Sequence, residues 1–137
     1  MPDVFEYFHD VTEESIDGQG HANNVVYVEW MQSAAVAHST AQGWPGHRYR
    51  ELGLGWVVRS HKIDYLVPAM AGDRIVVRTW VATMRKVTSI RRYRIHRVGD
   101  DALLAKAETN WAFIRFDTRQ PARIPAEVTD AFVLVDA

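Results

Sequence analysis

Hydrophobic and polar positions repeat with two different periods along this chain. Between Asn23 and Gly43 apolar residues such as Val26, Trp30 and Ala34 recur every three or four positions, which predicts a helix. Asn23 or Asn24 can cap its start, and Gly43 is a natural stop. The helix should therefore run about 18 to 20 residues, or roughly 30 Å.

The apolar stripe of this predicted helix is wide. The plainly polar positions along it are few, namely Glu29, Gln32, Ser33 and Thr40. A stripe of this width predicts a largely buried helix, and its alanines indicate close approach to a sheet.

Outside the helix the pattern predicts strands. Residues 4–11 are rich in β-branched and aromatic side chains, and after residue 55 apolar and polar positions alternate. One helical turn is expected in the preceding loop, near Tyr49 to Leu54. Alternating segments predict strands at residues 56–68, 74–86, 88–98 and 102–116. A short helix is expected at residues 124–132, with Pro125 in its first turn.

This order of elements indicates an α+β fold in one domain, residues 1–137. About five antiparallel strands have a single long helix to cover them, and a sheet wrapped round a central helix satisfies that economically. The outer surfaces of such a sheet favour dimerisation.

Composition narrows the function classes. The chain has 137 residues, 47% hydrophobic and 24% charged, as in ordinary globular domains. A formal net charge of -1 argues against nucleic acid as a partner, and the absence of cysteine excludes thiolate chemistry. No signal peptide and no apolar run long enough for a membrane span is visible, so a cytoplasmic location is expected. The histidines show no metal-ligand spacing.

The segment "SIDGQGHANNVVYVEW", residues 15–30, places one carboxylate in a glycine-rich turn just ahead of the helix. Asp17 there is either an Asx-turn residue without chemistry or a functional acid. A carboxylate can act as general base or nucleophile, and the free N–H groups of a helix N-terminus can hold a developing oxyanion. The arrangement therefore suits chemistry at a carbonyl group.

The same segment resembles the motif D-x-x-G-H-x-N-N-x-x-Y of hotdog-fold acyl-CoA thioesterases of the 4-hydroxybenzoyl-CoA thioesterase type, in the YbgC/FadM-like branch. The likeness continues through "SHKIDYLVPAMAGDRIVVRTWV", "KVTSIRRYRI" and the closing strand, and so covers about residues 4 to 130. The motif positions are Asp17, Gly20, His21, Asn23, Asn24 and Tyr27.

The resemblance implies roles for these residues. Asp17 would be the catalytic carboxylate and the backbone N–H near Asn24 the group that polarises the carbonyl, with no cofactor. His21 would support them, unless it is only a hydrogen-bonded turn residue. Gly20, Asn23 and Tyr27 would contribute to the substrate site, unless Asn23 is only a helix cap and Tyr27 belongs only to the core.

The resemblance also implies a homodimer or homotetramer with the active site at the subunit interface, acting on acyl-CoA or acyl-ACP. Relatives often carry a second acid two positions before the catalytic one, and here Ser15 stands in that place. Another branch of hotdog thioesterases carries its carboxylate on the helix, which makes Glu29 the rival of Asp17.

The basic segment from Arg85 to Arg97 is either a solvated strand or a site for the phosphates of coenzyme A. Arg85, Lys86 and Ser89 are the candidates for that contact. Two other functions stay open, a non-catalytic module that binds acyl thioesters and a hydratase or dehydratase of acyl thioesters on the same fold.

Overall fold

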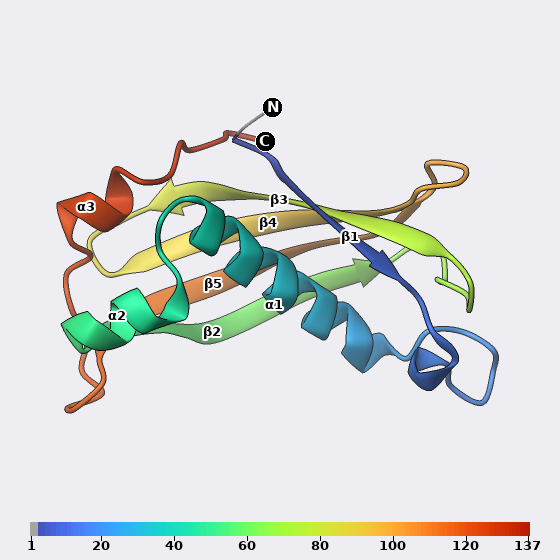
Figure 1. Ribbon diagram of the computed structural model, residues 1–137, viewed down its shortest axis with the longest axis horizontal. Coiled ribbons are helices and arrows are strands. Elements are labelled where there is room, and N and C mark those ends of the chain that lie inside the picture. Colours follow the sequence, from blue (N-terminus) through green and yellow to red (C-terminus); the bar gives the residue numbers. More distant parts are fainter. Residues whose placement is uncertain (1–2) are drawn as a thin grey trace.

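A computed structural model describes residues 3–137 and contains one antiparallel sheet with a long helix across it (Figure 1). Within these residues the sheet has five strands in the order β1-β3-β4-β5-β2. Their bounds are β1 Phe5–Asp10, β2 Leu54–Tyr65, β3 Arg74–Met84, β4 Thr88–Arg97 and β5 Leu103–Arg115. The predicted α+β class and the strand order along the chain are confirmed.

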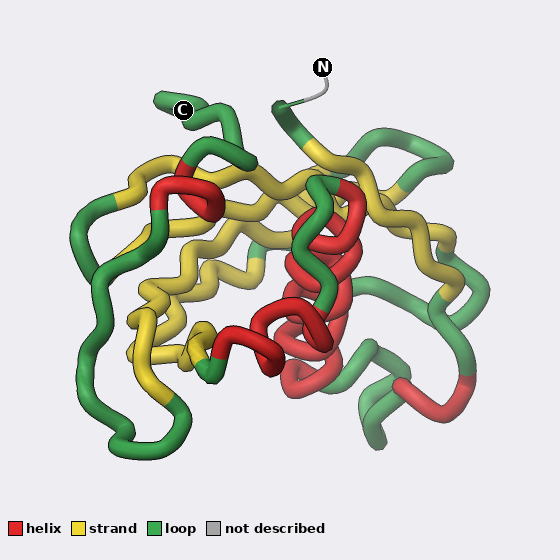
Figure 2. The backbone as a smooth tube through the Cα atoms, turned by 60° about the vertical axis from the view of Figure 1, so that its left-hand side comes forward, coloured by secondary structure: helices red, strands yellow, loops and turns green. Residues whose placement is uncertain are grey.

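The long helix α1, Asn24–Ala41, packs its buried side on the sheet. Tyr27, Trp30, Met31 and Ala34 meet inward-facing residues of β3 and β4, such as Ile75 and Tyr93, in one apolar cluster. Figure 2 shows the strands curving about this helix. The helix has 18 residues, begins after Asn23 and ends two residues before Gly43, as predicted. Gly43 has a φ of +91°, which favours glycine.

The helix is less buried than its composition predicts. Val25 and Val36 are 64% and 63% exposed, and Ala41 at the end of the helix is also exposed. The reason is geometric, because one sheet covers only one side of a helix. An apolar strip along α1 is therefore left open in the single chain.

The short helices lie near one end of the sheet (Figure 1). Helix α2 spans Gly46–Leu52 and begins earlier than the single turn expected near Tyr49 to Leu54. Helix α3 spans only Ala126–Thr129, and Pro125 is its N-cap and does not lie in its first turn. A second apolar cluster, including Trp44, Phe113 and Phe132, fills the space between them. A 3-10 turn, η1, Glu13–Ser15, lies at the opposite end, before the loop that carries Asp17.

Strand β2 forms one edge of the sheet, and its 12 residues pair with β5 alone. No helix in the described part of the chain is both long and apolar enough to cross a membrane.

Candidate active site

The loop before α1 is closed by backbone hydrogen bonds. Ile16 and Ala22 form an antiparallel bridge, the Asp17 N–H donates to the His21 carbonyl at 2.8 Å, and the Gly20 N–H donates to the Asp17 carbonyl at 3.1 Å. Gly20 has a φ of +82°, a conformation that side-chain-bearing residues adopt only at a cost. The sequence therefore needs glycine here to fold the chain back on itself.

The two carboxylate oxygens of Asp17 have different surroundings. Oδ1 accepts hydrogen bonds from the Gln19 N–H at 2.9 Å and from the His21 N–H at 3.2 Å. Oδ2 receives no hydrogen bond from any residue in the described range 3–137. Asp17 thus forms the Asx-turn that its sequence context suggests, and one oxygen stays free for a ligand or water.

The first turn of α1 leaves one N–H group without a partner. The Val25 N–H donates to Asn23 Oδ1 and the Val26 N–H to the Asn23 carbonyl, both at 3.0 Å. The Asn24 N–H has no acceptor among residues 3–137. Tyr65, at the end of β2, donates its hydroxyl to the Asn24 carbonyl at 3.2 Å and so braces the turn. Of the two asparagines expected as possible caps, Asn23 is the one that caps the helix.

Asp17 and the helix start border one cavity of about 400 Å³. His21, Asn23, Asn24 and Tyr27 line it with Asp17, and the segment 65–68 forms the opposite wall. Tyr27 is only 2% exposed and belongs to the core as well, where its hydroxyl accepts from the Ala69 N–H at 3.0 Å. Burial raises the pKa of the Tyr27 phenol, so this wall stays uncharged.

This geometry fits chemistry on a carbonyl group. An acidic side chain with a free oxygen and an oriented backbone donor border the same space. The donor can hold a carbonyl oxygen that becomes negative, and the carboxylate can activate water or attack. The His21 imidazole makes no hydrogen bond with any described residue, so it is not paired with Asp17 as a dyad.

The model of the family described as "Thioesterase-like superfamily" matches residues 11–132. The chain belongs to the thioesterase-like superfamily. It is a thioesterase, and its fold is the hotdog fold.

The chain is also similar to individual proteins. The chain is 26% identical over 120 residues, 87% of each chain, to the acyl-CoA thioesterase YbgC of Haemophilus influenzae. The 1,4-dihydroxy-2-naphthoyl-CoA thioesterase Slr0204 of Synechocystis superposes with a TM-score of 0.86 at 22% identity, covering 93% of this chain and 94% of the other. A hypothetical protein of Thermus thermophilus, TT1821, gives a TM-score of 0.86 at 26% identity over 93% and 96%.

The structure does not bring every predicted site residue of this thioesterase together. Arg85 and Lys86 are exposed in the β3–β4 turn, at the other end of the 11-residue strand β3 from the Asp17 loop. Strand geometry makes that separation about 35 Å. Within one chain, then, this basic turn and Asp17 cannot contact the same small molecule at close range.

Ser89 lies next to the basic turn, paired with Met84, but its side chain does not join Arg85 and Lys86 at the surface. It is buried, and its hydroxyl donates to the Thr83 carbonyl at 2.8 Å, next to an irregularity in the β3–β4 pairing. Glu29, the rival carboxylate, is exposed on α1 and does not line the Asp17 cavity. Ser15 contributes its backbone carbonyl to the Asn23 N–H at 2.7 Å.

Tyr65 and its neighbours were not expected at the site. Their signal in the sequence is the end of an alternating strand just before Pro68, a place where a chain must turn. Nothing local tells that this turn meets the start of α1.

Proposed function

We propose that this thioesterase hydrolyses acyl-CoA thioesters, or the related acyl-ACP thioesters, with Asp17 as the reacting carboxylate. The observation that carries the proposal is the free Oδ2 of Asp17 beside the free N–H of Asn24 on one cavity. The similarity to YbgC supports coenzyme A as the thiol.

The reaction needs only these groups and water. The thioester oxygen accepts from the Asn24 N–H, and Asp17 removes a proton from a water molecule whose oxygen bonds to the carbonyl carbon. The tetrahedral intermediate then loses its C–S bond, and the thiolate takes from Asp17 the proton that Asp17 removed from water. Alternatively Asp17 attacks directly, the thiolate leaves, and water cleaves the mixed anhydride. An oriented backbone donor contributes about 3 kcal/mol to such a step.

We further propose that the site is completed by a second copy of the chain. The exposed edge of β2 and the open strip at Val25 and Val36 supply a surface for it. Antiparallel pairing of two β2 strands sets the Tyr65 end of one chain beside the Leu54 end of the other. The partner's basic turn then comes toward the Asp17 cavity, where Arg85 and Lys86 can meet the phosphates of coenzyme A.

The test measures thiol release from a panel of acyl-CoAs, from short straight chains to long chains and aroyl groups. Asp17→Asn keeps the size of the side chain and removes its charge, and we expect it to lose about 100-fold or more in kcat. Asp130→Asn, an equally exposed change after α3, is the matched control and should keep wild-type turnover.

Three results would contradict the proposal. Equal turnover by Asp17→Asn and wild type would make Asp17 structural. Binding of acyl-CoA with no thiol release would favour a binding module, and a hydrated acyl chain still attached to its thiol would indicate a hydratase.

A further inference from the structure

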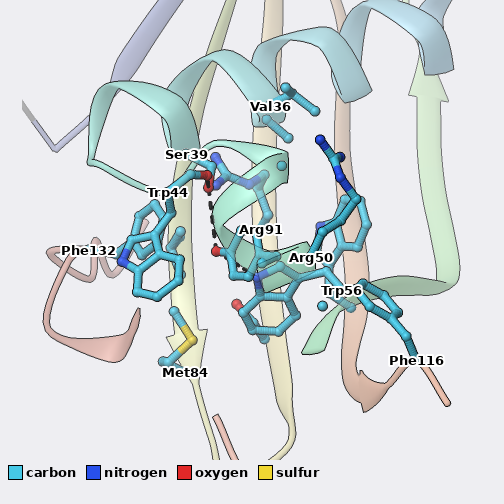
Figure 3. A pocket seen from close by; sticks show the side chains of 16 residues that line it. Val36, Ser39, Trp44, Arg50, Trp56, Met84, Arg91, Phe116 and Phe132 are labelled. Carbon is cyan, nitrogen blue, oxygen red and sulfur yellow. Dashed lines mark hydrogen bonds between the residues drawn. The ribbon is translucent and has the colours of Figure 1, made fainter. Parts of the chain in front are cut away.

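A second cavity, of about 410 Å³, lies at the end of α1 that is remote from Asp17 (Figure 3). It is bounded by α2, the C-terminal half of α1 and strands β2 to β5. Its walls include the aromatic residues Trp44, Tyr49, Trp56, Trp111, Phe116 and Phe132. A cavity of this size and lining is typical of sites for small organic molecules.

The aromatic walls are held in place by hydrogen bonds. Trp56 donates its indole N–H to the Tyr49 hydroxyl at 3.1 Å, and Trp44 donates to the Glu127 carbonyl at 3.3 Å. The Ser39 hydroxyl donates to the Trp44 carbonyl at 2.7 Å. The cavity is therefore preformed.

One buried side chain in this lining carries a full charge. Arg91 comes from the middle of β4 and is only 6% exposed. Its Nη1 donates to His38 Nδ1 at 2.9 Å and to the Thr79 hydroxyl at 3.1 Å. Nε and Nη2 have no acceptor within residues 3–137, so most of the donors of this guanidinium are unused.

Neither partner of Arg91 is an anion. His38 is 3% exposed, and its burial, with the Arg91 charge beside it, lowers its pKa to about 4. The imidazole is therefore neutral, with Nδ1 accepting from Arg91 and the hydrogen on Nε2. The Thr79 hydroxyl donates a hydrogen bond to the Arg92 carbonyl at 3.0 Å.

Other arginines of the sheet have carboxylate partners although they are less buried. Arg97 contacts Asp73 at 3.0 Å and Asp100 at 2.9 Å, and Arg78 contacts Glu6 at 2.9 Å. Over the described residues 3–137, no carboxylate lies within ion-pair distance of Arg91. A buried guanidinium keeps its proton, and leaving it unpaired is costly.

We propose that the cavity binds a molecule with a ring-containing apolar body and one carboxylate, and that the carboxylate pairs with Arg91. A carboxylate is planar and can accept two hydrogen bonds from the free side of the guanidinium. Its single charge balances the single buried cation, which a phosphate dianion would exceed. Flat rings fit the tryptophan and phenylalanine walls.

This carboxylate has two chemical sources. It is either a free carboxylic acid or the distal carboxylate of an acyl group bound as a thioester, and the second source rests on the function proposed above. Because the 18 residues of α1 make about 27 Å, an acyl group in this cavity would be attached to a thioester at the partner's Asp17.

The first experiment is calorimetric titration of the full-length protein with 4-phenylbutyrate and with 4-phenylbutanol, which has nearly the same shape without the charge. We expect the acid to bind at one site per chain, about tenfold or more tighter than the alcohol. Arg91→Met should remove this preference, while Arg50→Met, an exposed arginine on the same cavity, should keep it.

The comparison of acid with alcohol on the wild type decides the question even where Arg91→Met does not fold. Equal affinities for the two probes, no binding of the acid, or an unchanged preference in folded Arg91→Met would overturn the proposal. Absence of binding is also the result expected if a partner chain fills the cavity.

Two substrates distinguish the two sources. One is the CoA thioester of 4-carboxyphenylacetic acid with its ring carboxylate free, and the other is the same thioester with that carboxylate blocked as a methyl ester. A preference of about tenfold in kcat/KM for the free carboxylate, lost in Arg91→Met, assigns it to the acyl group. Binding of 4-phenylbutyrate without that preference assigns it to a free acid. Asp17→Asn should still bind 4-phenylbutyrate, so failure of the hydrolytic proposal leaves this result unaffected.

Discussion

At the scale of single residues, the two carboxylate oxygens of Asp17 have different surroundings. Oδ1 fixes the loop through two backbone N–H groups, while Oδ2 has no hydrogen-bond partner in residues 3–137. The position of Oδ2 therefore depends on the loop conformation, and that depends on Gly20.

Replacing Gly20 by alanine should lower both stability and activity. A side chain at a φ of +82° costs about 1 kcal/mol, although no heavy atom lies within 4 Å of the added Cβ. Thermal unfolding and thiol release measure the two effects.

Gly18 in the same loop offers a matched control. It also has open space around an added Cβ, but its φ is not positive. Gly18→Ala should change stability by less than about 0.5 kcal/mol. Equal losses for the two variants would show that strain at Gly20 is not the cause.

At the scale of elements, the start of α1 serves the helix and the site together. The Asn23 side chain occupies the Val25 N–H, so the Asn24 N–H is the donor left for a ligand. The cap thus determines which backbone N–H of the first turn is left without a partner in the described residues.

Asn23→Ala should cost about 1 kcal/mol of stability, because it removes the hydrogen bond to Val25. Asn24→Ala is the control, since the Asn24 side chain has no hydrogen bond with residues 3–137. Urea unfolding of the two variants measures the difference. A loss in Asn24→Ala as large as that in Asn23→Ala would mean that the cap seen here is not the stabilising contact.

At the scale of the whole molecule, stability should fall in acid because of His38. Burial first, and Arg91 second, lower its folded pKa to about 4, whereas the unfolded chain takes up the proton near 6.5. The unfolded state therefore binds more protons between these values, and folding weakens as the pH falls through them. Between pH 7 and pH 4.5 the loss should be about 2 kcal/mol.

Urea unfolding at the two pH values, for wild type and His38→Asn, tests this expectation. Asparagine can still accept from Arg91 but does not titrate. His61 and His96, whose pKa values are also lowered by burial, contribute equally to both proteins. The same acid loss in His38→Asn would assign the effect to other groups.

The sequence predicts well what local contacts determine. The cap at Asn23, the stop near Gly43 and the Asp17 turn all depend on partners within a few residues, and each was expected. The burial of Ser89 was not foreseen, because it depends on the pairing of β4 with an irregular part of β3.

The surroundings of Arg91 also depend on residues that are distant in the sequence. Its run of neighbouring arginines suggests a solvated strand, and its partner His38 lies 53 positions away. The alternation of β4 does hold a signal, since Arg91 shares a face with the buried residues Tyr93 and Ile95. Assigning the residues of β4 to the two faces of the sheet, instead of judging the strand by its composition, would have predicted that Arg91 is buried.

The length of α1 has a genetic consequence. The helix separates the two cavities in each chain. Each proposed composite site therefore takes its carboxylate from one chain and its guanidinium from the partner chain. Two defective alleles, Asp17→Asn and Arg91→Met, should therefore complement each other when co-expressed. Random assortment makes half of the dimers mixed, and each mixed dimer has one intact site out of two. About a quarter of wild-type turnover should therefore return when the substrate is a carboxylate-bearing thioester.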